Sequence, residues 1–281
     1  MIHNEETWLV IKHICIVSLL FEVNIHKKII IFSNYNYYSL ITIMIIIILL
    51  FFIFLISFYC YDNFYDDKIK IYSKNELINI LLNDSDNYVN SFNDNDFMAR
   101  NVKNKEEYYD NINNSCVDIS LKLKNKIREQ IEIANNKFDS YNIIGFDGKK
   151  CNNINWNIGI VNGSKYENGY PHTRDNIIII PKSIIHDSLY STLIHEKVHV
   201  YQKMYPEDIK IYLKNNNFNK INSNLINRAN PDIDNNIYTD KNDKILSCLY
   251  NKNPQSISDV KCSYSEHPFE FMAYQIQNEL Y

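Results

Sequence analysis

The sequence predicts a mixed α+β protein with a long apolar segment near its N-terminus, and three observations carry this prediction. Residues 40–58 contain no charged side chain. Residues 117–138 repeat apolar side chains at helical spacing. All five glycines fall within residues 145–169, and a β-branched run at 177–181 ends in proline, as expected for strands joined by turns. The C-terminal region therefore combines helices with a small sheet, which is an α+β arrangement.

Composition narrows the class of protein. The chain has 281 residues, a net charge of −4 and a hydrophobic content of 46%. The aromatic and aliphatic content is too high for a disordered chain, and the low glycine content excludes a collagen-like one. A net negative charge gives no basic field of the kind that binds nucleic acid, so we expect no nucleic-acid partner.

The uncharged segment at 40–58 predicts a membrane-spanning helix. Nineteen residues at ~1.5 Å per residue make a helix of about 28 Å, close to the ~30 Å of a bilayer core. A buried core helix is the alternative, but such a helix is seldom apolar on every side. A cleaved signal peptide is a second alternative, yet residues 57–60 show no small-residue cleavage pattern. We expect a tail at 1–39 and an uncleaved signal anchor at 40–60 that contacts the lipid bilayer through residues 40–58.

The residues after this segment suggest on which side of the membrane they lie. Four cysteines follow it, and an even number suits two disulfide bonds in an oxidising compartment. Three N-x-Ser/Thr sequons also follow it, at Asn83, Asn113 and Asn162. We therefore expect a single-pass membrane protein whose C-terminal domain is lumenal or extracellular. The alternative is four buried thiols in a reducing compartment. The cysteines are Cys116, Cys151, Cys248 and Cys262.

Helix and strand signals divide the rest of the chain. Ser73 and Glu76 form a capping-box pattern within residues 61–116, which we expect to be a helical stalk or small subdomain. Residues 117–281 should form a second domain, with strands at 156–161 and 177–181. A helix should then run from Asp187, its expected N-cap, to Met204, because Pro206 follows.

This helix contains the pattern His-Glu-x-x-His, and the pattern predicts a zinc site. His195 and His199 are four residues apart, so both lie on one face of the helix, one turn apart. Two imidazoles at this spacing can bind one Zn²⁺ at ~2.0–2.1 Å each. Glu196 follows the first histidine and can reach a water on the metal as a general base. The alternative is two surface histidines on a structural helix.

A catalytic zinc site needs a third protein ligand and an open fourth position. Residues 200–205 contain no further histidine, so the third ligand must come from later in the chain. Glu270 is our first candidate, because Pro268 suits the first turn of a second helix and small Ala273 permits that helix to approach the first. Glu266 and His267 stay open as alternatives.

These motifs resemble the gluzincin branch of the HExxH zinc metallopeptidases. Several stretches within residues 117–281 are also similar to uncharacterised putative metallopeptidases of large DNA viruses and some protists. They are residues 169–174, 177–181, 192–203, 228–232 and 266–273. The resemblance implies a zincin fold, Zn²⁺ as cofactor and hydrolysis of peptide bonds, and it implies nothing about residues 1–116.

Four further polar side chains are candidates for substrate contacts. His172 and Arg174 lie just before the apolar strand at 177–181, where they could contact substrate or a developing oxyanion. A turn held by local hydrogen bonds explains them equally well. Tyr274 and Tyr201 could donate to an oxyanion, although in a chain with 22 tyrosines a packing role is the simpler interpretation.

The function predicted first is a membrane-anchored zinc metallopeptidase, a hydrolase that acts on a protein or peptide substrate with Glu196 as general base. The alternative is a non-catalytic structural or attachment protein of a membrane or virion that keeps the fold. The intact Glu196 argues against this alternative, because a purely structural metal site does not need that carboxylate. A zinc hydrolase of non-peptide amides is a third interpretation.

Overall fold

The structure is a computed structural model, and it describes residues 43–56, 68–221, 229, 236–262 and 266–281. The chain divides into two compact units, Met1–Asn63 and Phe64–Tyr281, each of which is described by itself. The second unit mixes helices and strands, so the predicted α+β composition is confirmed for it.

The first unit contains a helix over residues 43–56, whose apolar side chains are largely exposed. It is the described part of the segment from which we predict a membrane anchor at 40–60. Among the described residues, no helix combines the length and the apolar character that crossing a membrane requires. Residues 1–42 and 57–60 lie outside the described residues, so the anchor and the N-terminal tail stay predictions.

The second unit is built on a four-stranded sheet with the order β1-β4-β6-β5. Strand β4 (Trp156–Val161) is parallel to both of its neighbours, β1 (Ile69–Ile71) and β6 (Ile177–Pro181). Strand β5 (His172–Arg174) pairs antiparallel with β6 and forms one edge of the sheet. The two strands predicted from the sequence are confirmed at their expected positions.

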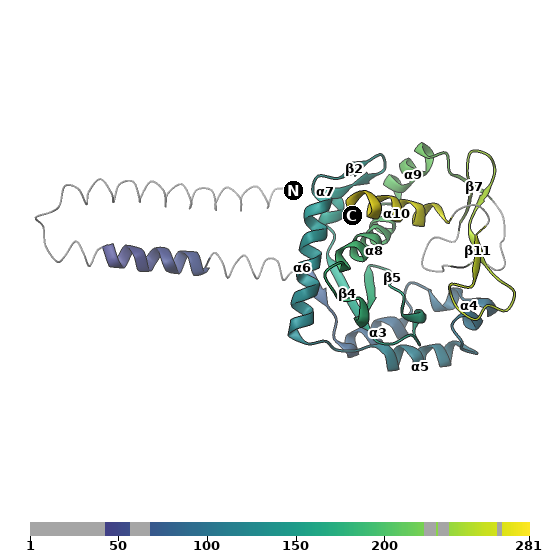
Figure 1. Cartoon of the computed structure of the whole chain (residues 1–281), viewed down its shortest axis with the longest axis horizontal. Coiled ribbons are helices and arrows are strands. Elements are labelled where there is room, and N and C mark those ends of the chain that lie inside the picture. Colours follow the sequence, from purple (N-terminus) through teal and green to yellow (C-terminus); the bar gives the residue numbers. More distant parts are fainter. Residues whose placement is uncertain (1–42, 57–67, 222–228, 230–235, 263–265) are drawn as a thin grey trace, which may run out of the picture. The chain divides into compact units, whose positions relative to one another are not determined.

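Helices cover both faces of this sheet (Figure 1). Alternate side chains of β4 and β6 point to opposite faces, so two apolar clusters form. Ile158 and Ile178 pack with the helices α6 (Leu121–Phe138), α8 (Leu189–Met204) and α10 (Pro268–Leu280). On the other face, Ile177 and Ile179 pack with α3 (Lys74–Asn83) and α5 (Lys105–Ser115).

This arrangement corrects the predicted domain boundary near residue 116. Residues 68–116 supply strand β1 to the sheet and two helices to one of its faces, so the predicted stalk or subdomain is part of the same compact unit as residues 117–281. The capping box of Ser73 and Glu76 at α3 is confirmed. The predicted N-cap Asp187 is wrong, because Ser188 occupies that position and the Asp187 carboxylate pairs with Lys126 instead.

Smaller elements complete the unit. They are α4 (Asp94–Ala99), η1 (Val89–Ser91), β2 (Asn142–Ile143), β3 (Phe146–Asp147), α7 (Gly148–Asn152), η2 (Glu167–Gly169), η3 (Lys182–Ile184), α9 (Pro206–Asn215), β7 (Asn219–Ile221), β8 (Ile237–Thr239), β9 (Ile245–Leu246), β10 (Cys248–Tyr250) and β11 (Val260–Cys262). Strands β10 and β11 form an antiparallel hairpin, and strands β7, β8 and β9 form a separate sheet.

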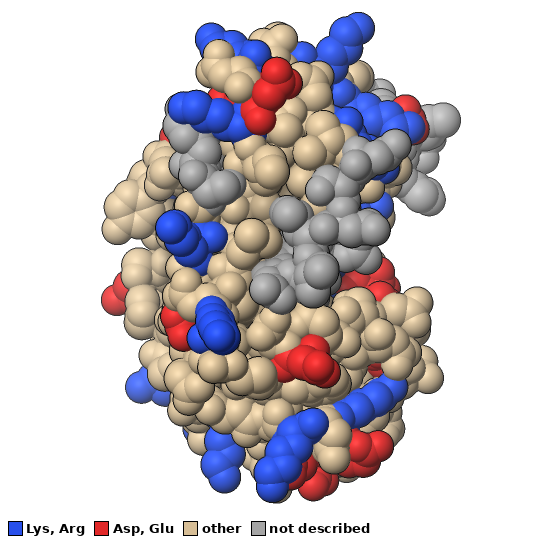
Figure 2. Space-filling model, turned by 90° about the vertical axis from the view of Figure 1, so that its right-hand side faces the viewer, with Lys and Arg blue, Asp and Glu red and all other residues tan. Residues whose placement is uncertain are grey.

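The surface shows no concentration of one charge on the face drawn in Figure 2. Lys and Arg side chains are interspersed there with Asp and Glu side chains over mostly uncharged residues. Charge therefore does not single out a binding area on this face, and the candidate site has to be located from its chemistry and shape.

The four cysteines among the described residues form one disulfide bond rather than the predicted two. Cys248 and Cys262 are bonded across the β10–β11 hairpin. Cys116 and Cys151 are free and buried. The second predicted bond is wrong because Cys116 belongs to the apolar cluster on one face of the sheet and Cys151 to the cluster on the other.

A buried ion pair joins the region before residue 116 to the loop after β4. The Arg100 guanidinium donates to both carboxylate oxygens of Glu167, with N–O distances of 2.8 Å each, and Tyr108 donates to the same carboxylate. Burial alone would raise the pKa of Glu167, but Arg100 outweighs it and lowers the pKa to about 2. The carboxylate is therefore charged at neutral pH.

The thiol arrangement predicts a specific alkylation pattern. Burial raises the pKa of both Cys116 and Cys151 to about 12, so neither should react in the native protein at neutral pH. After unfolding in denaturant without reductant, both should be alkylated, whereas Cys248 and Cys262 should need a reductant first. Peptide mapping by mass spectrometry distinguishes the four positions. Alkylation of Cys248 or Cys262 without reductant would contradict the assignment.

The Arg100–Glu167 pair predicts a stability loss in acid and in one variant. Glu167 has a depressed pKa in the folded state, so its contribution is fully present above its unfolded value of about 4.3 and is lost as the pH falls towards 2. Arg100→Met should cost about 3–5 kcal/mol at pH 7, because it leaves a buried carboxylate without its cation.

Urea unfolding at pH 7 and pH 3 measures both effects. The double variant Arg100→Met/Glu167→Gln is the matched control and should be more stable than Arg100→Met alone. Equal stability of the single and double variants would show that the pair does not behave as described.

Candidate metal centre

Helices α8 and α10 pack against each other and bring the predicted ligands together. Val198 of α8 and Ala273 and Ile276 of α10 are fully buried in the same apolar cluster. Ala273 has only a methyl group, so it permits a close approach of the two helices. Lys197 points away from the site and donates to the carbonyl oxygens of Ile154 and Asn155, which holds α8 against the start of β4.

Three side-chain atoms converge where these helices meet. The Nε2 atoms of His195 and His199 are 3.2 Å apart. The Glu270 carboxylate oxygens lie 3.3 Å from the Nε2 of His195 and 3.5 Å from that of His199. Two atoms bound to one tetrahedral Zn²⁺ at ~2.0–2.1 Å are themselves ~3.3–3.4 Å apart. The distances therefore suit a zinc ion held by the two histidine nitrogens and by the Glu270 carboxylate, whose Oε2 faces His195 and whose Oε1 faces His199.

The hydrogen bonds of Gln202 and Gln277 orient both histidines. The side-chain amide nitrogen of Gln202 donates to the carbonyl oxygen of Phe269 (2.8 Å), which leaves its Oε1 to accept from Nδ1 of His199 (2.9 Å). Gln277 donates to Ser191 (2.9 Å) and accepts from Nδ1 of His195 (3.1 Å). With Nδ1 as the donor, Nε2 of each neutral ring carries a lone pair.

These lone pairs make the cluster a candidate cation site. Two nitrogen lone pairs and a carboxylate face one another, and only a positive species between them relieves the repulsion. Burial alone would raise the pKa of Glu270, but the interactions of its carboxylate with the His199 and His195 imidazoles outweigh burial and lower the pKa far below its ordinary range. A proton can supply the positive charge, and so can a metal ion with affinity for two nitrogens and one oxygen, such as Zn²⁺.

Glu196 lies beside this cluster without belonging to it. It is buried and lines the same cavity as the three converging residues. Its carboxylate accepts a hydrogen bond of 2.8 Å from the hydroxyl of Thr173 on strand β5. Glu196 therefore lies next to the three-residue cluster without being one of its members, and its role as a base stays a prediction.

The cavity has a volume of about 460 Å³, within the range of small-molecule and peptide-binding sites. One wall is formed by α8 and α10, and another by Tyr250 and Val260 of the disulfide-bonded hairpin. Tyr88 and Arg100 also line it, so residues before 116 contribute directly to the site.

The two alternative third ligands occupy other positions. His267 is the N-cap of α10, where its Nδ1 accepts from the backbone N–H of Phe269 (3.2 Å). Glu266 lines the cavity, but its carboxylate lies near the sulfurs of Cys248 and Cys262 rather than in the cluster with the histidines. The geometry therefore brings Glu270 to the histidines, and not Glu266 or His267.

The predicted substrate contacts divide into two groups. His172 and Tyr274 line the cavity. Tyr274 packs edge-on against His195, and burial together with nearby carboxylates raises its pKa to about 12, so it stays protonated at neutral pH. Tyr201 is a packing residue, as the simpler interpretation holds, because it is buried and donates to Asp208.

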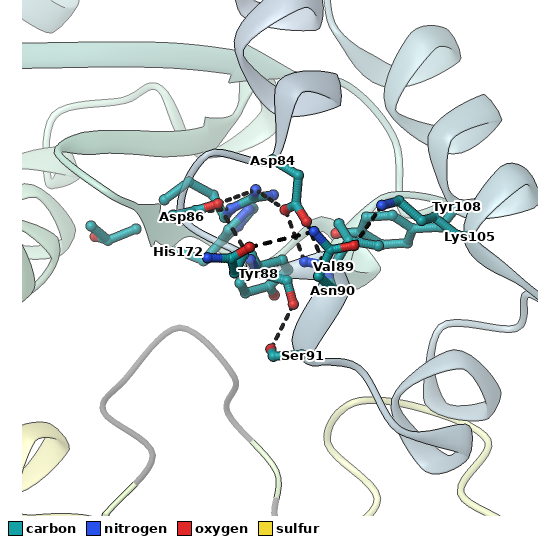
Figure 3. Close-up of polar contacts among 12 residues, drawn as sticks. Asp84, Asp86, Tyr88, Val89, Asn90, Ser91, Lys105, Tyr108 and His172 are labelled. Carbon is teal, nitrogen blue, oxygen red and sulfur yellow. Dashed lines mark hydrogen bonds and ion pairs between the residues drawn. The ribbon is translucent and has the colours of Figure 1, made fainter.

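Arg174 does not line the cavity, which corrects its predicted role. It is buried, and its guanidinium donates to Asp84 (2.9 Å) and in two bonds to Asp86 (2.6 and 2.7 Å). Figure 3 shows these two carboxylates at the loop after α3, where Asp84 also accepts from the backbone N–H of Val89. Arg174 therefore fixes the edge strand β5 to this loop.

The sequence patterns did not indicate three residues that contact the site, Gln202, Thr173 and Gln277. Gln202 follows His199 by three positions on the same helix, so helical spacing could have indicated it. Thr173 and Gln277 reach the site only through the pairing of β5 and the packing of α10, and nothing in the sequence pattern marks them.

Comparisons with known proteins found no match. Neither protein-family models, nor curated proteins, nor solved structures resemble the chain closely enough to identify a relative. The inference about function therefore depends on the geometry of the site.

The cluster predicts which substitutions remove a bound metal. The full-length protein should bind one equivalent of Zn²⁺, and Glu270→Ala should remove most of it, because two histidines alone bind zinc weakly. Gln202→Ala should weaken the affinity about 10–100-fold through loss of ligand orientation. Elemental analysis and competition with a chelator measure both effects.

Glu266→Ala is the matched control for these substitutions and should keep full zinc content. Stoichiometric zinc in Glu270→Ala would contradict the assignment of Glu270 as the third ligand. Zinc loss in Glu266→Ala would indicate Glu266 as the third ligand instead.

Proposed function

We propose that the chain is a zinc-dependent metallopeptidase with a zincin-like catalytic domain. The observation that carries the proposal is the convergence of His195, His199 and Glu270, with Glu196 beside them in the same cavity. Two nitrogen ligands and one carboxylate leave a fourth position open, as in catalytic zinc sites. The resemblance of the motifs to gluzincins and to viral putative metallopeptidases supports the same class.

Zinc bound at this cluster would polarise a substrate carbonyl and acidify a water molecule. Glu196 would accept a proton from the attacking water and pass it to the leaving amine. Tyr274, which is protonated at neutral pH and lines the cavity, would donate a hydrogen bond to the developing oxyanion. No side chain in this scheme forms a covalent bond to the substrate.

The edge strand β5 supports a peptide rather than a small amide as substrate. It borders the sheet beside the cavity, and His172 of this strand lines that cavity. An extended peptide can add to such an edge through backbone hydrogen bonds, which a small amide cannot do. We therefore favour a peptide substrate over a non-peptide amide.

The second candidate function is a non-catalytic structural or attachment protein with the same metal centre. The burial of Glu196 beside the ligands speaks against it, because a buried carboxylate that binds no metal costs stability and a structural site gains nothing from it.

Localisation belongs to the proposal as well. We propose an anchor at residues 40–58 and a catalytic domain on the lumenal, extracellular or virion side. The disulfide bond between Cys248 and Cys262 supports an oxidising compartment.

Turnover of casein or a peptide library tests the enzymatic proposal. The zinc-loaded full-length protein should cleave peptide bonds, and Glu196→Gln should keep its zinc while kcat falls by a factor of about 100 or more, since it can no longer accept a proton. Tyr274→Phe should lower kcat less severely and should also keep zinc.

A zinc-loaded wild-type protein that cleaves no peptide would favour the structural alternative. Full activity in Glu196→Gln would exclude this carboxylate as the base, whatever the metal content.

A further inference from the structure

Side chains of strand β5 make contacts on both of its faces, and its middle residue, Thr173, faces the candidate base Glu196. Arg174 ties one face of the strand to Asp84 and Asp86. Successive side chains of a strand point to opposite faces, so Thr173 faces the other way, towards α8. Thr173 is fully buried there. The strand therefore presents the Thr173 hydroxyl at a fixed position beside Glu196.

The hydroxyl of Thr173 has two acceptors within reach, both in Glu196. Its Oγ1 lies 2.8 Å from the carboxylate oxygen Oε2 and 3.2 Å from the backbone carbonyl oxygen. A hydroxyl has one proton, and the carboxylate oxygen at the shorter distance is the better placed acceptor. The proton therefore points to the carboxylate.

Glu196 depends on this bond for its orientation. A glutamate side chain has several rotatable bonds, and a general base needs one fixed direction towards the reacting atoms. Among the described residues, the hydrogen bonds to the Glu196 carboxylate come from Thr173. One carboxylate oxygen is thus occupied by the strand, which leaves the other oxygen for proton transfer.

We propose that Thr173 is a positioning residue that holds the Glu196 carboxylate in its working orientation beside the metal centre. This inference deepens the proposed function and rests on it for its catalytic consequence. Thr173 neither belongs to the cluster of His195, His199 and Glu270 nor lines the cavity, so its effect passes through Glu196.

Kinetics of two substitutions test the catalytic consequence. Thr173→Val keeps the shape of the side chain and removes the hydroxyl, whereas Thr173→Ser keeps the hydroxyl. Thr173→Val should lower kcat about 10–100-fold while KM changes less than about twofold and zinc content stays at one equivalent. Thr173→Ser should recover kcat to within about threefold of wild type.

Thr239→Val is the matched control, because Thr239 is a buried threonine on β8 that does not line the cavity. It should leave kcat and KM unchanged. Unchanged kcat in Thr173→Val, or an equal loss in Thr173→Ser, would overturn the inference.

Thermal unfolding of the metal-free protein tests the hydrogen bond without any activity. In the wild-type background Thr173→Val should lower Tm by roughly 2–4 °C, the shift expected for a lost hydrogen bond in a chain of this size. In a Glu196→Ala background the same substitution should lower Tm by less, because the carboxylate acceptor is gone and only the longer bond to the backbone carbonyl oxygen of residue 196 (3.2 Å) remains to be lost.

The kinetic and the unfolding measurements distinguish a failure of the proposed function from a failure of the inference about Thr173. Equal Tm losses in both backgrounds overturn the inference. If the zinc-loaded wild type cleaves no peptide, the proposed function fails, and the unfolding cycle alone decides whether Thr173 holds Glu196.

Discussion

The mutual repulsion of three electron-rich atoms is the constraint on which the site depends. His195, His199 and Glu270 place their lone pairs within 3.2–3.5 Å of one another at the junction of two buried helices. Such an arrangement is unfavourable unless a positive charge lies at its centre. The packing of α8 on α10 supplies the free energy that holds the atoms there, and Gln202 and Gln277 fix the ring orientations.

The rest of the second unit supports this junction from outside. Residues 68–116 are part of the same unit as the candidate site, because they complete the sheet, cover one of its faces and line the cavity with Tyr88 and Arg100. The Arg100–Glu167 and Arg174–Asp84 pairs are almost fully buried, so each is satisfied by its partner and not by water. The edge strand β5 is consequently held by long-range ion pairs as well as by its pairing with the adjacent strand β6.

The sequence predicted what depends on local spacing. The two strands at 156–161 and 177–181, the histidine pair and the helix starting at Pro268 all follow from patterns within a few residues. It could not predict contacts set by tertiary packing. Arg174 bonds to Asp84, which is 90 positions away in the sequence. Cys116 and Cys151 stay unpaired because they lie in the apolar clusters on opposite faces of the sheet, and no spacing rule encodes that placement.

Anomalous X-ray diffraction at the zinc absorption edge, on crystals of the protein grown with Zn²⁺, tests the central claim most directly. The account predicts one strong anomalous peak about 2 Å from Nε2 of His195, Nε2 of His199 and a carboxylate oxygen of Glu270. The carboxylate of Glu196 should lie near the peak but outside bonding distance. A peak coordinated by other side chains, or zinc-soaked crystals with no peak between these three residues, would contradict it.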